Sequence, residues 1–416
     1  MDRVTNGKPS TEVIGPGPSN AWVFALILAM VGIAIGWYGP IQVLLPAQAQ
    51  AIAPAGREAL LAVVTGSGAA ASMIANPLWG VLSDRLRLRR GSRTPVIIIG
   101  LVVAVVGLVI LSAAQTPAPM VIGWVIAQAG LNGPFAVLAA LIADRVPEER
   151  RGVVGSLFGV AQLAGTVAGT LIAVALGEGA WGYAAIAIAV PLLAVPLLAF
   201  PERSAPAVVQ VESAPRQRLR DIGIPRPFVA AFVLRFLMNL VSALGLLYLY
   251  YFLSARTGVD DVGEWVLILT LIYVVIAGVV AVVGGMIADR LRARRAVAAV
   301  AAVILAVGAL VFVFAGSAPA IVAAVAAFGA GYGLYLSIDI AIVTDALPDP
   351  HTRATFLGVA NIASTAPQVL APVVAAPIVL SAGGYPALYA ATAVIALLSL
   401  AVLPFVGTPA AVKGKS

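Results

Sequence analysis

The chain has 416 residues, of which 61% are hydrophobic and only 10% are charged, and its mean hydropathy is +1.04. Such a small number of polar groups could not cover the surface of a soluble domain. The composition therefore excludes an ordinary globular protein and predicts a membrane protein. The absence of cysteine excludes a disulfide framework, a thiolate nucleophile and a cysteine-ligated metal. The net charge of +7 would suit a nucleic-acid-binding protein, and the positions of the basic residues decide that question.

Twelve apolar runs follow one another along the chain, and each is long enough to cross a bilayer, which takes about 20 predominantly apolar residues. In chain order they cover 21–45, 59–82, 95–114, 119–143, 153–176, 181–200, 227–252, 264–288, 296–315, 319–346, 355–380 and 385–405. Each run is expected to be a helix, because lipid cannot satisfy exposed backbone groups. The sequence therefore predicts an all-α polytopic membrane protein with twelve transmembrane helices. The first run is too long for the apolar core of a signal peptide, so we expect it to remain as a span.

All but three of the 25 lysines and arginines fall in every second connection between these runs, beginning with the N-terminal segment. The exceptions are Arg57, Arg235 and Arg256. This asymmetry follows the positive-inside rule and predicts a multi-pass protein of the plasma membrane with both termini in the cytoplasm. Charges that set topology explain the basic segments better than a nucleic-acid surface does, so we expect no nucleic-acid partner.

One motif occurs twice, about half a chain apart. Gly80-Val-Leu-Ser-Asp-Arg-Leu-Arg-Leu-Arg-Arg90 returns as Gly285-Met-Ile-Ala-Asp-Arg-Leu-Arg-Ala-Arg-Arg295. In the same way, the segment that begins at Asp144 returns at Asp345, which relates helices four and five to helices ten and eleven. A six-helix unit has therefore been duplicated and joined in tandem.

The segment 201–226 divides the two copies. It is rich in proline and mixed charge, which is typical of a linker, and we expect it in the cytoplasm. The expected parts are a tail 1–20, a six-helix bundle 21–200, the linker, a second bundle 227–405 and a tail 406–416. Units with an even number of spans enter the membrane in the same orientation, so a pseudo-two-fold axis along the membrane normal relates them. A binding site is expected at their interface.

The repeated motif carries a family resemblance. Gly-x-x-x-Asp-Arg followed by an arginine pair, between the second and third spans, resembles the signature of the major facilitator superfamily, although Arg87 stands where glycine is common. The longer spacing, followed by Gly91-Ser-Arg-Thr-Pro95, resembles the sugar:cation symporters of the glycoside–pentoside–hexuronide and sucrose transporter type. The resemblance implies the major facilitator fold and a charged gating latch between the halves, with simple charge anchoring of a short loop as the alternative. The latch residues that it implies are Asp84, Arg85, Arg89, Arg90, Asp289, Arg290, Arg294 and Arg295.

The fifth span lacks the Gly-Pro motif that drug:proton antiporters of this superfamily typically carry. It contains instead two glycine pairs at four-residue spacing, Gly155 with Gly159 and Gly165 with Gly169. This spacing predicts close helix packing.

Two ionisable residues fall deep inside the apolar runs, Arg235 in helix seven and Asp339 in helix ten. From the helical rise, each is expected ~10 Å from the cytoplasmic end of its helix, so the two lie at matching depth. Charges at the bilayer centre cost on the order of 2.5–3.5 kcal/mol each, and they normally face a cavity or each other. Two interpretations stay open: a structural salt bridge, or a coupling pair in which Asp339 takes up a proton and releases Arg235.

Further polar residues follow helical spacing around this pair, which suggests continuous polar faces. The resemblance implies that helices one, four, seven and ten line the cavity. The predicted substrate-binding residues are Trp37, Tyr38, Gln42, Gln128, Asn132, Asn239, Tyr332, Tyr335, Asn361 and Gln368. A lining of amides, hydroxyls and aromatic rings suits a polyol such as a sugar. Hydrogen bonding between helices is an equal alternative for any one of these residues.

The sequence therefore predicts a secondary active transporter for a small polar solute such as a sugar, working as a proton symporter, with sodium coupling left open. The alternatives are an efflux transporter for a hydrophobic or amphipathic compound and a membrane sensor or scaffold that does not transport. No nucleotide-binding or catalytic motif occurs, so we expect no enzyme, no cofactor and no metal site. The expected partners are the solute, the coupling proton and the lipid bilayer, with the chain acting as a monomer.

Overall fold

The computed structural model describes residues 18–200, 225–259, 261–291, 293–347, 353–381 and 383–406. Almost all of the predicted linker 201–226, and most of both predicted tails, lie outside these residues.

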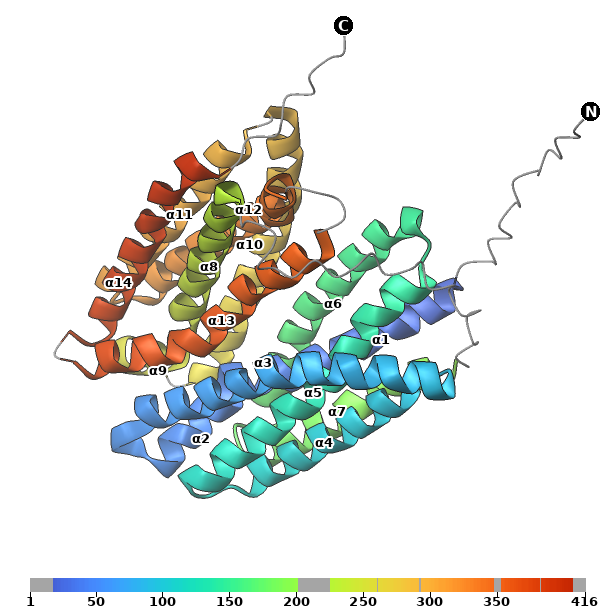
Figure 1. The fold of residues 1–416 in the computed structure, drawn as a ribbon. Coiled ribbons are helices and arrows are strands. Elements are labelled where there is room, and N and C mark those ends of the chain that lie inside the picture. Colours follow the sequence, from blue (N-terminus) through green and yellow to red (C-terminus); the bar gives the residue numbers. More distant parts are fainter. Residues whose placement is uncertain are drawn as a thin grey trace, which may run out of the picture.

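The first half of the chain folds into seven α-helices and two short irregular turns (Figure 1). They are α1 (Asn20–Gly39), η1 (Pro40–Leu44), α2 (Leu45–Ile52), η2 (Pro54–Gly56), α3 (Arg57–Arg90), α4 (Thr94–Ala113), α5 (Pro117–Arg145), α6 (Glu148–Ala175) and α7 (Ala180–Leu198). The second half holds α8 (Arg226–Leu247), α9 (Leu249–Arg256), α10 (Val262–Leu291), α11 (Arg294–Phe314), α12 (Ala318–Asp345), α13 (Arg353–Leu380), α14 (Gly384–Leu398) and η3 (Ser399–Phe405).

The predicted fold class is confirmed, because the described residues hold 12 helices that are long and apolar enough to cross a membrane, and they contain no strand. The predicted spans differ most at the beginning: the first helix continues to Ile52 and the second to Arg90. The apolar pattern stops at the first charge, whereas helical hydrogen bonding continues until Gly91, which ends α3 in a left-handed conformation with φ of 70°. The predicted seventh run is broken at Tyr248, where α8 ends and α9 begins.

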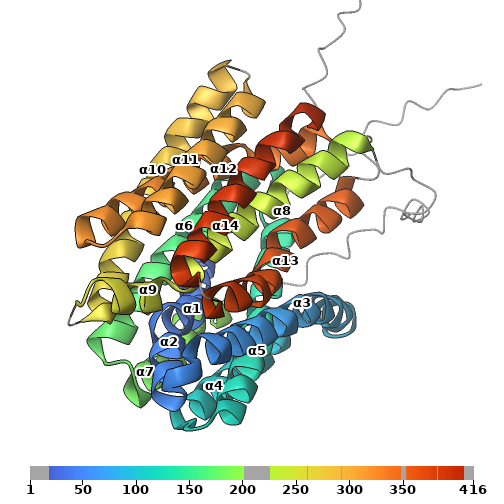
Figure 2. The same ribbon diagram turned by 90° about the vertical axis from the view of Figure 1, so that its left-hand side faces the viewer.

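Each half packs mainly on itself. α1 contacts α6 and α7, and α5 lies between α3 and α4, while the second half repeats this arrangement with α8 on α13 and with α12 between α10 and α11. Figures 1 and 2 show the two halves as separate groups of helices, with α3 and α13 side by side where the groups meet. α6 against α10 makes the other main contact between the halves.

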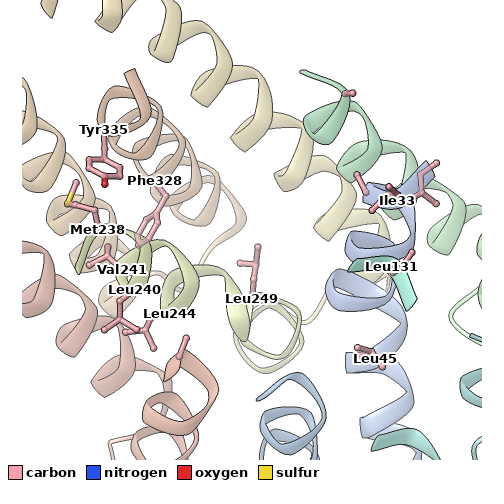
Figure 3. Packing of buried hydrophobic residues seen from close by; sticks show 14 of the residues in the cluster. Ile33, Leu45, Leu131, Met238, Leu240, Val241, Leu244, Leu249, Phe328 and Tyr335 are labelled. Atoms are coloured by element: carbon pink, nitrogen blue, oxygen red, sulfur yellow. The ribbon is translucent and has the colours of Figure 1, made fainter. Parts of the chain in front are cut away.

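The duplication is visible in how helices approach one another. At Gly107 of α4, a Cβ would lie 2.3 Å from the backbone nitrogen of Ala127. At Gly308 of α11, a Cβ would lie 2.9 Å from the ring of Phe328, at the equivalent crossing with α12. The glycines thus allow the same close crossing in both halves. Figure 3 shows Phe328 and Tyr335 of α12 beside Met238 and Val241 of α8, all four of which belong to the buried apolar core.

The two ends of the bundle differ in chemistry. The end at which α3 stops and α4 begins carries the repeated arginine motif, and we call it the basic end. The opposite end carries Tyr248, Tyr250, Tyr251 and Tyr385, and we call it the tyrosine end. Chain direction alternates between the two ends because consecutive long helices are joined by short connections.

The glycines of α6 divide into two pairs with different surroundings. At Gly165 a Cβ would lie 2.4 Å from the Cβ of Ala34, and at Gly169 it would lie 2.9 Å from backbone atoms of α1. At Gly155 and Gly159, toward the basic end, a Cβ would meet nothing within 4 Å. Close helix packing, which was predicted for all four, therefore applies to the pair nearer the tyrosine end.

This difference predicts opposite results for one substitution at two places in the same helix. Gly165→Ala should lower the free energy of unfolding by about 1–3 kcal/mol, because the new methyl group overlaps α1. Gly159→Ala, the matched control, should leave stability unchanged or slightly higher, since alanine favours helix. Thermal unfolding in detergent measures both, and equal transition temperatures for the two variants would contradict the packing described.

Candidate functional site

The two charges predicted at matching depth meet in the second half. Arg235 of α8 and Asp339 of α12 form an ion pair with 3.1 Å between Nη1 and Oδ2, and their side chains are only 16% and 9% exposed. The hydroxyl of Tyr335, one helical turn earlier on α12, donates to the other carboxylate oxygen at 2.5 Å. In a low-dielectric setting such a pair, with a further hydrogen bond to the carboxylate, offsets part of the cost of burying both charges.

Polar and aromatic neighbours extend this pair into a network. The Asn239 amide donates to the Arg235 carbonyl at 2.8 Å and accepts from the Tyr332 hydroxyl at 3.0 Å. The Tyr332 ring lies between those of Tyr273 and Tyr335, with centroid distances of 6.5 and 6.1 Å. Five predicted residues of helices seven and ten are thus brought together with a tyrosine from α10 that was not predicted.

The polar face of α13 lies beside this network. The Arg235 guanidinium donates to the Ser364 hydroxyl at 3.5 Å, and this hydroxyl contacts the side-chain oxygen of Asn361 at 3.3 Å. Asn361 and Gln368 are both exposed. Both amides are therefore at the surface of the fold, and the Asn361 oxygen also accepts from Ser364.

In the first half, the predicted amides of helix four bond to a neighbouring helix. Ser72 of α3 donates to the Gln128 side-chain oxygen at 2.9 Å, and the Asn132 amide donates to Ser72 at 2.9 Å and to the Gln128 carbonyl at 2.8 Å. Both amide residues are buried. The geometry therefore favours the interhelical alternative for Gln128 and Asn132.

The predicted residues of helix one have three different environments. The Tyr38 hydroxyl accepts from the Gln162 amide at 3.0 Å, and the Trp37 ring meets Phe135 edge to face at 5.2 Å. Within the described residues, the Trp37 indole nitrogen has no hydrogen-bond partner. Gln42 lies in the π-helical turn η1 and accepts a hydrogen bond from Thr270 of α10, so it joins the two halves.

Helix one also reaches the second half near this network, because Thr270, which donates to Gln42, lies one turn before Tyr273 on α10. The network around Arg235 and the aromatic face of helix one therefore belong to one region between the bundles.

The predicted latch residues lie at the basic end, and their described ion pairs stay within one half. Asp84 pairs with Arg93 at 2.7 Å rather than with a residue of the other bundle, and Arg93 also contacts Asp144 at 3.0 Å. In the second half Arg294 pairs with Asp345.

The other latch residues take no described part in a contact between the halves. Arg85, Arg89, Arg90 and Arg290 are exposed, and Arg295 donates to the carbonyl of Val406. The side chain of Asp289 lies outside the described residues. Pairing across the halves stays a prediction for another conformation.

Arg93 and Asp144 were quoted in the sequence motifs but not assigned a role. The internal repeat could have identified this pair, because Arg93 precedes Asp144 by 51 residues and Arg294 precedes Asp345 by the same 51. An arginine at the start of one helix and an aspartate at the end of the next long helix thus tie two helices together in each half.

Breaking the buried pair should be more harmful than removing it. Arg235→Gln leaves the Asp339 carboxylate without its cation, and the expected loss is about 3–5 kcal/mol in the free energy of unfolding. The double variant Arg235→Gln/Asp339→Asn removes both charges and should recover most of that loss. Unfolding in detergent measures the cycle, and a double variant less stable than Arg235→Gln would contradict the pairing.

Comparisons with known proteins agree with this architecture. The family profile described as the Major Facilitator Superfamily matches residues 22–263 and 261–416. A comparison with curated proteins finds no match.

Among solved structures, a D-xylose-proton symporter matches with a TM-score of 0.73 and 18% identity, over 94% of this chain and 99% of that one. A peptide transporter in complex with sulfate matches with a TM-score of 0.73 and 13% identity, over 94% and 97%. A bacterial homolog of the human lysosomal transporter Spinster, in an inward-facing and occupied conformation, matches with a TM-score of 0.72 and 15% identity, over 94% and 95%. Identities this low show the fold alone. Since the family profile spans nearly all of the chain and the twelve-helix fold agrees with it, the chain belongs to the major facilitator superfamily, whose members are membrane transporters rather than enzymes.

Proposed function

We propose that the chain is a secondary active transporter that moves a small polar solute across the plasma membrane by alternating access. The observation that carries this proposal is where the halves are joined. In the described part, the hydrogen bonds between the halves all lie toward the tyrosine end, while the ion pairs of the basic end stay within one half. Two bundles joined in this way can rock and present one site to each side of the membrane in turn.

The orientation follows from charge. The positive-inside rule places the basic end in the cytoplasm, together with both termini, so this conformation is inward-facing. The open surroundings of Gly155 and Gly159 near the basic end support this assignment. The Spinster homolog, in its inward-facing and occupied conformation, has a similar fold.

Proton coupling is assigned to Asp339. Its carboxylate is held by the Arg235 cation and the Tyr335 hydroxyl, so a proton on Asp339 would remove the charge that holds Arg235 in place. The released guanidinium, with its donors in a fixed fork, could then bind a solute oxygen. The Arg235–Asp339 pair would thereby respond to both the proton and the solute.

A sugar or related polyol is the solute class that the lining supports best. Tyr332, Tyr273 and Trp37 are half-buried aromatic residues whose accessible parts a sugar ring can contact, and Asn361 and Gln368 offer exposed amides for hydroxyl groups. The D-xylose-proton symporter shares the fold, and so do peptide and nucleoside transporters, so the neighbours do not choose among these solutes.

Export of an amphipathic compound is the second candidate. It is favoured by the apolar contact of Trp37 with Phe135, whose ring stacks on Phe158 at 6.1 Å. A ligand screen of the purified protein by thermal shift separates the two, because a ligand at 100 times its Kd stabilises the folded state by about 2.7 kcal/mol. Stabilisation by sugars supports the first proposal, and stabilisation by amphipathic drugs alone overturns it.

The coupling proposal makes a prediction for Asp339→Asn. An asparagine cannot take up the proton, so accumulation driven by a pH gradient should fall to the level of simple equilibration, whereas exchange of labelled solute in counterflow should persist. Proteoliposomes loaded with the solute found in the screen measure both. Full gradient-driven accumulation by this variant would refute the assignment.

A further inference from the structure

The tyrosine end is held together by hydroxyl groups of the second half that reach acceptors in the first. Tyr248 donates to the Glu58 carbonyl at 3.0 Å, and Tyr251 donates to the Pro46 carbonyl at 2.9 Å. Tyr385 donates to the Glu58 carboxylate at 2.8 Å. These contacts and a fourth, from Tyr250, are called the tyrosine interlock below.

The break between α8 and α9 arranges three of these side chains. Tyr248 adopts φ of −109° and ψ of 20°, which ends one helix and starts the next at a new direction. The rings of Tyr248 and Tyr251 then stack at 6.1 Å, and Tyr250 meets Tyr251 edge to face at 5.9 Å. All three residues are at most 7% exposed, so their hydroxyls are held in fixed directions.

Glu58 is the residue on which the interlock converges. Its carbonyl receives Tyr248 from the α8–α9 junction, and its carboxylate receives Tyr385 from α14. Arg57 holds the same carboxylate oxygen at 3.0 Å and also lies over the Tyr251 ring, 4.9 Å from its centroid. One residue of the first half therefore ties two separate elements of the second.

The fourth contact sits apart from Glu58. Tyr250 donates to the Glu178 carboxylate at 2.7 Å, in the connection between α6 and α7. Burial raises the pKa of Glu178, nearby Asp261 acts in the same direction, and the bond from Tyr250 acts against both. This contact adds a bond between the halves at the connection that follows α6.

These bonds suit a gate better than a permanent joint. A tyrosine hydroxyl and its acceptor both find water when the halves separate, so each bond contributes only about 0.5–1.5 kcal/mol net. We propose that Glu58 is a positioning residue for the transport cycle, which holds the tyrosine end shut in this conformation and must release Tyr248 and Tyr385 before that end opens. The inference rests on the proposed alternating access.

The test measures distance across both ends of the protein. The chain has no cysteine, so introduced cysteines are the only labelled sites. Gln115→Cys with Ser381→Cys places exposed spin labels on the two halves at the tyrosine end, and Leu88→Cys with Leu291→Cys does so at the basic end. Pulsed electron resonance on the full chain in nanodiscs then gives the population open at each end.

Tyr385→Phe removes one hydroxyl, and Glu58→Ala removes the carboxylate. The fraction open at the tyrosine end should rise roughly five-fold for Tyr385→Phe and further for Glu58→Ala, with a matching rise in short distances at the basic end. If Tyr385 and Glu58 only supported the fold, their substitutions would broaden the distance distributions at both ends without shifting them in opposite directions.

Tyr183→Phe is the matched control. It removes a hydroxyl bond of 2.8 Å to Gln48 at the same end, but this bond lies within the first half, so both distributions should stay as in the parent. Unchanged distributions in Tyr385→Phe and Glu58→Ala, or an equal shift in Tyr183→Phe, overturn the inference. The readout is conformation rather than uptake. Loss of coupling at Asp339 and loss of the interlock are therefore separate results.

Discussion

The organisation of this molecule depends on ion pairs that, in the part of the chain that the structure describes, form within one half rather than between the halves. Every ion pair in the described part of the chain joins residues of the same bundle, from Arg93 with Asp144 to Arg235 with Asp339. A separated charge in lipid has no substitute partner, whereas a separated hydroxyl at the end of the bundle has water. The hydrogen bonds between the halves all have a hydroxyl group as donor in the described residues. The bundles can therefore move apart at one end without exposing an unpaired buried charge.

The duplication is not symmetric at the candidate site. With the register set by Arg93 on Arg294, Leu138 of α5 corresponds to Asp339 of α12, so the first half has no carboxylate at this place. The second half holds the ionisable pair, while helix one of the first half offers aromatic rings. In the proposed cycle, the second bundle holds the coupling pair and most of the solute contacts, the first adds the aromatic face of helix one, and the relative motion of the bundles brings the two sets of contacts together or apart.

The sequence was sufficient for properties that the bilayer dictates: the twelve spans, the duplication and the matching depth of Arg235 and Asp339. The sequence did not determine which of several neighbouring residues forms a given contact. The motif pointed to Arg89 and Arg90, but in the fold Arg93 reaches Asp84, because the chain turns at Gly91 and brings the start of α4 against the end of α3. The interlock gave no signal either, since tyrosines near span ends are common at membrane interfaces whatever they bind.

The central claim is that transport needs the two halves to part at the tyrosine end. Gln42→Cys and Thr270→Cys, whose parent side chains bond across the halves, can be joined by a short thiol cross-linker. The account predicts that the joined protein loses counterflow of its solute and regains it when a cleavable linker is cut, while Gln42→Cys alone keeps, after the same treatment, the counterflow that it had before it. Counterflow at the unlinked rate in the joined protein would contradict the account.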